Sequence, residues 1–265
     1  MVNEESSLKR VVCVVLAAGQ GTRMGSSINK VLLPINGKPV IIYAIETFER
    51  CSAVDEILLV AAVGEEERLA TIARDARCHK VRQVIHGGAT RHASEQCALE
   101  VLRARITRGE VELVLIHDGA RPFVAVEKVE QLIRKAREVG GAILAAPLQA
   151  GERLVQVDSK QSIQRSFEGR LVWKAQTPQV FQASLLLAAY DQADRDQFYG
   201  TDTASSVERI GGRVAVVESD SSNLKITTAH DLLLAEKLCR YRPNAGTSIP
   251  GTSTPGTRKG YHYIT

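Results

Sequence analysis

The stretch VVCVVLAAGQGTRMGSSINKVLLPINGKPVI, residues 11–41, joins an apolar run to a glycine-rich turn and then to a segment with helical spacing. Residues 11–16 are rich in β-branched side chains and show no polar alternation, which is typical of a strand buried on both faces. Pro39 stands where a helix has its first residue, and apolar side chains follow it at spacings of three and four. The stretch therefore predicts a strand, a loop that carries chemistry and a helix.

The glycine turn does not match the two common phosphate-binding fingerprints. The third glycine of G-x-G-x-x-G is missing, because Met24 stands at that position, and no G-x-x-x-x-G-K-[ST] sequence occurs in the chain. These departures argue against a dinucleotide site and against a P-loop. The loop instead carries Arg23 and Lys30, two cations seven residues apart, and this combination suits a triphosphate.

The rest of the chain alternates short apolar runs with helical patterns. The apolar runs lie at residues 56–62, 80–85, 113–116 and 142–146, and the helical patterns lie at residues 65–76, 91–105 and 127–139. This alternation predicts an α/β fold with a doubly wound, mostly parallel sheet. In such folds the ligand binds at the carboxyl ends of the strands, where the glycine loop is expected to lie.

Two segments break the alternation. Residues 148–175 are polar and show a two-residue period, so they predict a hairpin excursion from the sheet, a β-arm. Residues 241–265 are rich in Pro, Gly, Ser and Thr and predict a disordered tail. A last helix is expected at 229–239, with Thr228 and Asp231 as its capping box. Residues 8–240 are therefore expected to form a single domain.

Composition excludes several classes of function. The net charge is +4, and positive and negative residues are interspersed without a basic tract. This distribution argues against a nucleic-acid partner. The five cysteines are scattered and never in C-x-x-C spacing, so they predict neither disulfides nor a zinc site and fit a reducing cytoplasm. The N-terminus lacks the apolar region of a signal peptide, and no run reaches 18 apolar residues. The protein is expected to be neither exported nor embedded in a membrane.

Two patches that follow predicted strands carry chemically useful residues. IHDGARPF, residues 116–123, places His117, Asp118 and Arg121 where an open α/β sheet has its ligand groups. HGGATRHAS, residues 86–94, has glycines that allow a flat ligand to approach the backbone. Both patches also have a purely structural interpretation, as a turn or helix cap and as a tight turn into a helix.

Three later patches have the same ambiguity. KAQTPQVF, residues 174–181, ends the excursion, and its Pro178 can also be read as the terminator of an edge strand. Thr201 and Asp202 begin a helix and can simply be its cap. Lys225 is expected in a short strand that enters the last helix, where a lone lysine is ordinarily solvated.

The order and spacing of these patches resemble those of the cytidylyltransferases of the non-mevalonate isoprenoid pathway, which join 2-C-methyl-D-erythritol 4-phosphate to CTP. The resemblance covers about residues 8–240 and rests on LAAGQGTRMG, NK, LLPINGKPVI, GG with a following R and S, HDGARPF, AAP, AQTPQVF, TDTASSVE and NLKITT. The opening alone is shared by many sugar-phosphate nucleotidyltransferases. HDGARPF with AQTPQVF and NLKIT narrows the resemblance to the methylerythritol and ribitol phosphate cytidylyltransferases.

The resemblance implies a Rossmann-like fold of the nucleotide-diphospho-sugar transferase type, with a β-arm that pairs two subunits into a homodimer. It implies that an oxygen of the acceptor phosphate attacks the α-phosphorus of CTP and that pyrophosphate leaves as its Mg²⁺ complex. Since the attacking phosphate is already ionised, the reaction needs preorganised cations and a metal more than a general base. This explains why the sequence shows no Ser-His-Asp or paired-carboxylate arrangement.

The resemblance also implies roles for individual residues. The catalytic cations would be Arg23, Lys30 and Lys225. The cytosine and ribose would be bound by Ala17, Ala18, Gly19, Gly88 and Ser94. The acceptor would be bound by Asp118, Arg121, Arg170, Thr201 and Asp202, and Asp118 would be the candidate protein ligand of Mg²⁺.

Three positions depart from the family pattern, all on the acceptor side. The arm arginine of the family falls on Gly169, with Arg170 next to it and Arg165 four residues earlier. We expect Gly169 to permit a bulge that turns Arg170 into the acceptor site of the neighbouring subunit, with Arg165 as the alternative. A threonine of the family falls on Gly151, and an aspartate falls on Ser222.

These departures keep other acceptors and other functions open. Methylerythritol phosphate is the favoured acceptor, and ribitol 5-phosphate or another polyol phosphate is the alternative. A glycosyltransferase of similar sheet type would need a D-x-D metal motif, but Ala120 stands two residues after Asp118. A catalytically inactive relative that binds nucleotide is suggested only by Gly151 and Gly169.

Overall fold

The computed structural model describes residues 9–19, 29–149, 151–167 and 169–241. Within this part of the chain, seven strands form one sheet in the order β11-β7-β10-β6-β1-β4-β5. They are β1 (Arg10–Leu16), β4 (Glu56–Ala61), β5 (Val81–His86), β6 (Val111–Asp118), β7 (Gly141–Pro147), β10 (Trp173–Gln182) and β11 (Val214–Glu218). The α/β fold predicted from the sequence is confirmed, and the predicted apolar runs all lie in strands of this sheet.

The parallel half of the sheet is built around β1. This strand pairs in parallel with β4 on one side and with β6 on the other. Its central residues Val11, Val12, Cys13, Val14 and Val15 are buried. Burial on both faces explains why the strand has no polar alternation.

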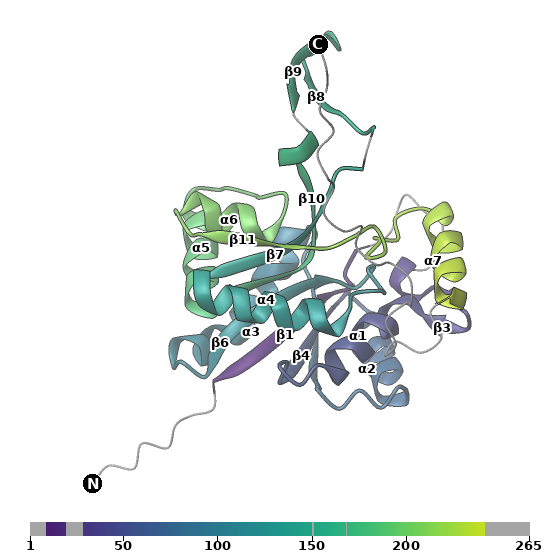
Figure 1. The fold of residues 1–265 in the computed structure, drawn as a ribbon. Helices are drawn as coiled ribbons and strands as arrows, with labels where there is room; N and C mark the ends of the chain where they lie inside the picture. Colours follow the sequence, from purple (N-terminus) through teal and green to yellow (C-terminus); the bar gives the residue numbers. More distant parts are fainter. Residues whose placement is uncertain (1–8, 20–28, 150, 168, 242–265) are drawn as a thin grey trace, which may run out of the picture.

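Helices cover both faces of the sheet, so the body has three layers (Figure 1). One face packs against α1 (Val40–Arg50), α2 (Glu66–Asp75) and α4 (Val126–Val139). The other face packs against α3 (Arg91–Thr107), α5 (Ala183–Arg195) and α6 (Thr203–Arg209). This arrangement leaves the carboxyl ends of β1, β4 and β6 open to a ligand.

Strand β10 differs from the sequence-based expectation. It is antiparallel to both β6 and β7 and lies between them, so Pro178 is inside the sheet and does not terminate an edge strand. The register with β7 shifts between Ala175 and Gln179, and the shifted stretch contains the proline. Because proline has no N–H to donate, such an irregularity is where an interior strand tolerates it.

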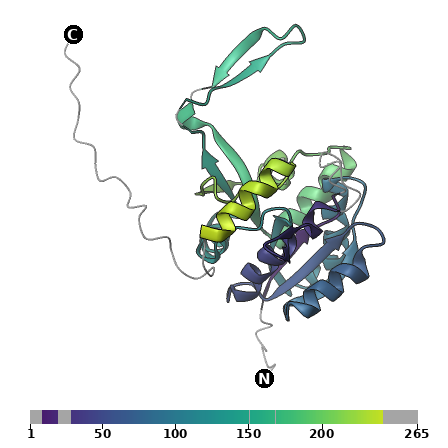
Figure 2. The same ribbon diagram turned by 90° about the vertical axis from the view of Figure 1, so that its right-hand side faces the viewer.

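The predicted β-arm is present. Strands β8 (Leu154–Val157) and β9 (Ile163–Phe167) form an antiparallel hairpin that projects away from the three-layered body (Figures 1 and 2). A single 3₁₀ turn, η3 (Gly169–Leu171), connects the hairpin to β10. The backbone of Gly169 is not among those with positive φ, so the bulge expected at this residue is replaced by a helical turn.

The final helix, α7 (Ala229–Tyr241), packs over the short hairpin of β2 (Pro34–Ile35) and β3 (Lys38–Pro39). The capping box is confirmed, since Thr228 N–H donates to Asp231 Oδ2 at 2.8 Å and Asp231 N–H donates to Thr228 Oγ1 at 3.3 Å. Residues 224–227 have no regular secondary structure, so the short strand expected around Lys225 is wrong. The predicted tail lies outside the described residues apart from Tyr241. No helix in the described part of the chain is long and apolar enough to span a membrane.

Candidate active site

A cavity of about 540 Å³ opens at the carboxyl ends of β1 and β6. It collects residues that are far apart in the sequence, from the glycine loop, the start of α3, the end of β6 and the segment before α7. The lining residues are Leu16, Ala18, Gly19, Lys30, Val31, Gly88, Ala89, Thr90, Arg91, Ser94, Asp118, Ala120 and Lys225. Seven of them were singled out in the sequence: Ala18, Gly19, Lys30, Gly88, Ser94, Asp118 and Lys225.

The glycine loop leaves β1 and returns to it through Asn29. Ala17 donates its N–H to the Val60 carbonyl at 2.7 Å, and its own carbonyl accepts from Asn29 Nδ2 at 2.8 Å. Ala17 therefore anchors the loop and does not line the cavity, unlike Ala18 and Gly19. The predicted site residue Arg23 lies outside the described residues.

Asn29 also fixes the position of Lys30. The Asn29 side chain is buried, donates to Glu65 Oε2 at 2.7 Å, and accepts from Val31 N–H at 3.3 Å. It thereby caps the short 3₁₀ helix η2 (Lys30–Leu32), whose first residue lines the cavity. Sequence reasoning missed Asn29, although an Asn directly before a short apolar turn is a capping signal.

The loop between β5 and α3 forms the opposite wall. A Cβ added to Gly87 would lie 2.7 Å from both Ala18 Cβ and Ser94 Oγ, so only glycine permits this close approach of the two loops. Ser94 Oγ donates to the Thr90 carbonyl at 2.9 Å and accepts from Gly88 N–H at 3.2 Å. The tight turn between β5 and α3 therefore also forms this wall of the cavity.

Asp118 is the electrostatic centre of the cavity. Its carboxylate lies 2.8 Å from Lys225 Nζ, 3.4 Å from Arg91 Nε and 3.6 Å from Arg121 Nε. Burial alone would raise the pKa of Asp118, but the nearby Lys225, Arg91 and Arg121 outweigh burial and hold the pKa well below its usual range. Asp118 is therefore an anion that gathers three cations at one edge of the sheet.

The segment that carries Lys225 is tied to the loop after β6. Ile226 N–H donates to the Ala120 carbonyl at 2.9 Å, and Arg121 Nη1 donates to the Asn223 carbonyl at 2.7 Å. Asn223 Nδ2 in turn donates to the Thr177 carbonyl at 2.9 Å. These bonds explain how Lys225 is positioned without the strand that the sequence predicted.

His117 supports the loop that follows β6. Its ring is fully buried against Phe48, with 5.0 Å between ring centroids, and its Nε2 lies 3.0 Å from the Arg121 carbonyl oxygen. Burial lowers the pKa of His117 to about 4, so the ring is neutral at physiological pH. Thr177 Oγ1 lies 3.3 Å from His117 Nδ1 and accepts from Asp118 N–H at 3.0 Å. His117 is thus a neutral support for the loop.

The other predicted acceptor residues do not line the cavity. Arg121 lies behind Asp118 with an 11% exposed side chain. Asp202 caps α6, accepting from Ser205 N–H at 3.1 Å and from Gln179 Nε2 at 3.0 Å. Thr201, the residue before this cap, is exposed. The structural interpretation of Thr201 and Asp202 as a helix start is therefore correct, whatever further role they have.

Arg165 on the arm does not line the cavity of its own chain. Arg165 is exposed on β9, and its guanidinium carbon lies 5.0 Å from the centroid of the Phe167 ring. The Arg170 backbone is in η3, and its side chain lies outside the described part of the structure. Gly151, at the base of the arm, has φ of +90°, a conformation in which the threonine of the family pattern would be strained.

Two charged residues of α3 were not assigned a role from the sequence. Arg91 lines the cavity, and Glu95 lies behind it with 1% exposure. Arg91 Nη1 is 2.7 Å from Glu95 Oε1, while Arg91 Nε faces Asp118. An Arg and a Glu four residues apart in a helical pattern ordinarily indicate a solvated helix face, which is why the pattern gave no signal for these two.

The donor set does not form a preassembled metal site. No group of three or more His, Cys, Asp or Glu side chains that could hold a metal ion occurs among the described residues. Asp118 is the one carboxylate lining the cavity within this part of the chain, and it is already paired with cations. Mg²⁺ typically binds through one or two carboxylates together with substrate phosphates. The cavity fits a metal that arrives on a phosphate ligand better than a resident ion.

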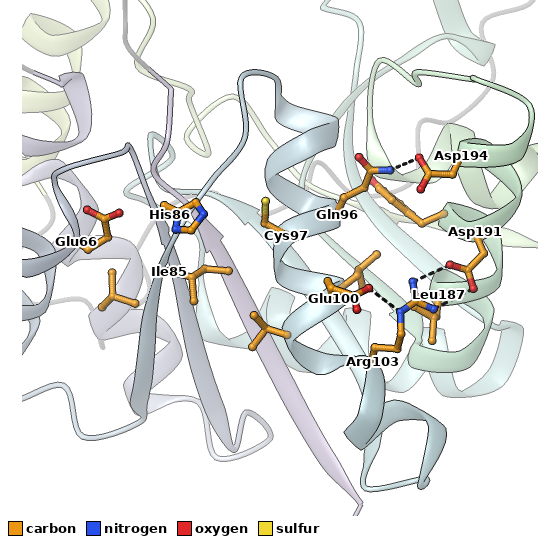
Figure 3. Close-up of a pocket in the computed structure, with 14 residues that line it drawn as sticks. Glu66, Ile85, His86, Gln96, Cys97, Glu100, Arg103, Leu187, Asp191 and Asp194 are labelled. Atoms are coloured by element: carbon orange, nitrogen blue, oxygen red, sulfur yellow. Dashed lines mark hydrogen bonds and ion pairs between the residues drawn. The ribbon is translucent and has the colours of Figure 1, made fainter.

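A second, larger cavity of about 680 Å³ lies between β5, α3 and α5 (Figure 3). Polar side chains on its wall pair with one another, since Gln96 Nε2 donates to Asp194 and Arg103 bridges Glu100 and Asp191. Arg103 neutralises only part of the negative charge on this wall, because Glu66 and Asp194 also line the cavity, and a negatively charged wall disfavours a phosphate. The smaller cavity is therefore the better candidate for a phosphate-bearing ligand.

Known proteins resemble this chain over nearly its whole described length. A sequence model of the 2-C-methyl-D-erythritol 4-phosphate cytidylyltransferase family matches residues 11–241. The protein of that name from Shouchella clausii is 42% identical over 231 residues, which are 87% of this chain and 97% of the relative. The one from Geobacter metallireducens is 40% identical over 235 residues, 88% of this chain and 98% of the relative.

Solved structures agree with the sequence comparison. A 4-diphosphocytidyl-2C-methyl-D-erythritol synthase from Anaerococcus prevotii superposes with a TM-score of 0.75 at 27% identity, covering 88% of this chain and 99% of that one. A 2-C-methyl-D-erythritol 4-phosphate cytidylyltransferase from Thermus thermophilus gives a TM-score of 0.68 at 29% identity, covering 87% and 99% of the two chains. Both the fold and the chain length therefore match.

Proposed function

The chain belongs to the 2-C-methyl-D-erythritol 4-phosphate cytidylyltransferase family, and on this premise we propose how its residues perform the reaction. The enzyme transfers CMP from CTP to 2-C-methyl-D-erythritol 4-phosphate and releases pyrophosphate, a step in isoprenoid precursor biosynthesis. The observation that carries the assignment of the site is the cavity in which Lys30, Arg91 and Lys225 meet beside the glycine loop.

The cations act on the charge that develops in the transition state. When the acceptor phosphate attacks the α-phosphorus, negative charge builds on the equatorial oxygens and on the departing pyrophosphate. Lys30 lines the cavity close to where the glycine loop returns, so we assign it, together with Arg23, to the triphosphate. Lys225, which lines the cavity beside Asp118, stabilises the α-phosphate as its charge increases.

The nucleoside lies between the two glycine-containing loops. Ala18 and Gly19 on one wall and Gly88 and Ser94 on the other offer backbone groups and one hydroxyl at the cavity surface. Backbone groups in fixed positions distinguish a cytosine by its pattern of donors and acceptors. Ala17 contributes indirectly, by holding the first loop on β1.

The acceptor lies on the side of Asp118 and Arg121, with the arm of a second subunit above it. Asp118 orients Lys225 and Arg91, and Arg121 fixes the loop that carries Asp118. Thr201 and Asp202 begin α6 near this edge, and Gln179 links Asp202 to β10. An arm guanidinium, from Arg170 or Arg165, supplies the bidentate contact to the acceptor phosphate.

We assign the metal to the substrate. Arg23 and Lys30 would hold the triphosphate on which Mg²⁺ is carried, and the ion would supply positive charge for the leaving pyrophosphate. The pairing of Asp118 with Lys225 supports this view, because a carboxylate that already neutralises a cation is a poor initial ligand for a metal. Among the described residues, Asp118 is the one carboxylate that lines the cavity.

The β-arm is the proposed dimer contact. A two-stranded hairpin alone is marginally stable in water, yet β8, β9 and the adjoining turn expose apolar side chains. These are Leu154, Val155, Val157, Ile163 and Leu171, and Trp173 at the start of β10 is exposed as well. Val157 and Ile163 pair across the hairpin, so Val157→Lys with Ile163→Lys is expected to convert the dimer to monomers in sedimentation velocity. An unchanged sedimentation coefficient would exclude the arm as the contact.

We place the enzyme in the cytoplasm. The five cysteines are all free thiols, which fits a reducing compartment.

Pyrophosphate release tests the function. The purified full chain is incubated with CTP, Mg²⁺ and 2-C-methyl-D-erythritol 4-phosphate, and then with ribitol 5-phosphate and erythritol 4-phosphate in its place. Methylerythritol phosphate is expected to give the highest kcat/KM, and CTP to outcompete ATP, GTP and UTP. Equal turnover of UTP contradicts the recognition of cytosine, and faster turnover of ribitol 5-phosphate identifies the alternative acceptor.

A further inference from the structure

Glu95 is a buried acid behind the wall of the active-site cavity. It lies in the second turn of α3 and is 1% exposed. Its Oε1 accepts from Thr203 Oγ1 at 3.1 Å and pairs with Arg91 Nη1 at 2.7 Å, while its Oε2 accepts from the Tyr190 hydroxyl. Burial of a carboxylate is costly unless partners compensate it, and here three side chains from α3, α5 and α6 converge on one group.

Arg91 connects this buried acid to the cavity. Its side chain is 27% exposed and faces Glu95 through Nη1, Asp118 through Nε and Thr203 through Nη2. Asp118 in turn faces Lys225 at 2.8 Å. Negative and positive side chains therefore alternate in a row of four, Glu95, Arg91, Asp118 and Lys225, which runs from the core to the cavity.

We propose that Glu95 is a positioning residue of the reaction, holding Arg91 against the cavity wall and thereby leaving Asp118 to orient Lys225. The inference rests on the proposed function of the cavity, and in particular on Lys225 as the cation at the α-phosphate. Glu95 itself contacts no substrate, because Arg91 stands between it and the cavity.

The charge balance along the row explains how Glu95 acts at a distance. With Glu95 ionised, Arg91 is shared between two carboxylates and faces Asp118 through Oδ1, while Asp118 Oδ2 faces Lys225 at 2.8 Å and Arg121 at 3.6 Å. With Glu95 neutral, Arg91 has Asp118 as its one carboxylate partner within the row. Arg91 then competes with Lys225 for the same group, and the Lys225 ammonium is held less firmly.

The environment of Glu95 makes its effect on Arg91 and Lys225 sensitive to pH near neutrality. The charged and titratable groups that face it are Arg91 on its own helix, Tyr190 on α5 and, farther away, Asp118 on β6 and Asp202 at the N-cap of α6. Burial raises the pKa of Glu95 to about 7 against the opposing effect of Arg91. Glu95 is therefore charged above neutral pH and increasingly protonated below it.

Glu95→Gln isolates the charge, because glutamine keeps an oxygen that can accept from Thr203. We expect kcat at about pH 8 to fall roughly tenfold, while KM for CTP stays within about twofold. The wild-type kcat should decline as the pH falls through about 7. This acidic limb of the pH–rate profile, the pH limb, should be absent from Glu95→Gln. Glu100→Gln on the same helix, whose side chain is 69% exposed and paired with Arg103, is the matched control and should leave both kcat and the limb unchanged.

A second measurement does not depend on turnover. The ion pair with Asp118 shields Lys225 Nζ from acetic anhydride, and the acetylation rate of Lys225 is read by mass spectrometry relative to Lys135, which is 43% exposed on α4. Glu95→Gln should raise this relative rate about threefold or more, and Glu100→Gln should not. Tyr190→Phe removes one donor to the Glu95 carboxylate, so it should move the pH limb upward even if Glu95→Gln fails to fold.

The outcomes separate the two claims. A wild-type protein that releases no pyrophosphate refutes the proposed function, and the acetylation rate still decides the role of Glu95. An active wild type together with unchanged kcat, pH limb and Lys225 acetylation in Glu95→Gln overturns the inference and leaves the proposed function intact.

Discussion

Replacing Asp118 by Asn would remove the one negative charge that three cations share at the edge of the sheet. The side chains of Arg121, Arg91 and Lys225 are 11%, 27% and 36% exposed. Lys225 can turn toward water, so the loss of its pair contributes little. Arg121 cannot, because its Nη1 is held by the Asn223 carbonyl, and its buried Nε makes no hydrogen bond within the described residues and faces Asp118 Oδ2 at 3.6 Å.

The magnitude follows from this difference. Breaking a buried ion pair by removing one partner costs about 3–5 kcal/mol, and relaxation of Lys225 and Arg91 places Asp118→Asn near the lower limit, at about 3 kcal/mol. For a chain of this length, that free energy corresponds to a decrease in Tm of roughly 6–12 °C. The loss should be accompanied by a large decrease in kcat, since Lys225 and Arg91 lose their common anchor.

Thermal unfolding measured by calorimetry tests this reasoning, with Glu138→Gln as the control. Glu138 pairs with Lys135 at 2.7 Å but is 60% exposed, so its replacement should change Tm by only about 1 °C. The pKa of Asp118 is depressed in the folded state, so its contribution is present above the ordinary Asp pKa of about 4 and is lost as the pH falls through the lower folded value. Because Glu95, which shares Arg91 with Asp118, has its pKa raised to about 7, the Tm difference should be constant between about pH 8 and pH 9, where both carboxylates are ionised. A variant within about 2 °C of the wild type, or a gap that disappears across this interval, would refute the argument.

Three further predictions concern other residues. Arg23→Ala and Lys30→Ala should each lower kcat about a hundredfold or more without lowering Tm, and near-normal turnover in steady-state kinetics would remove that residue from the triphosphate site. Arg170→Ala or Arg165→Ala should raise KM for the acceptor and leave KM for CTP nearly unchanged; if neither does, the arm does not bind the acceptor phosphate. His117 is buried as the neutral ring with its pKa lowered to about 4, so the wild type should lose stability as the pH falls from about 6.5 toward that value. His117→Gln should flatten this part of the Tm profile, and an equally steep profile would show that His117 does not cause it.

The parallel half of the fold could be predicted because its signals are local. The strands β1, β4 and β6 are continuous apolar runs, and the helices between them repeat every three or four residues. Strand β10 was harder, since its Gln-Thr-Pro-Gln interruption looks like a strand end. Only its pairing with β6 and β7, which are distant in the sequence, shows that the interruption is an irregularity inside the sheet.

The residues of the candidate site also divide into those with a local sequence signal and those without one. Gly88, Ser94, Asp118 and Lys225 stand in short motifs that follow strands or precede a helix, and the fold brings them to one cavity. Glu95 could not be recognised from its neighbours in the chain, because its burial is produced by α5 and α6, which come about a hundred residues later. The sequence also could not show that Arg121 holds the segment before α7 through the Asn223 carbonyl and that Asp202 caps α6, while Thr201 is exposed.

The position of β10 between β6 and β7 has a consequence for the order in which the protein is completed during synthesis. The strands β6, β1, β4 and β5 are adjacent in the sheet and all come from the first half of the chain, so they can assemble before the remainder leaves the ribosome. At that stage β6 is an open edge, and Asp118 at its end has no Lys225 to pair with. Lys225 lies roughly a hundred residues further along the chain and is translated on the order of ten seconds later. Such an edge invites pairing with another nascent chain. Insertion of β10 closes this edge and supplies the Thr177 carbonyl to which Asn223 then donates, so the strand that protects β6 also anchors the segment that brings Lys225 to Asp118.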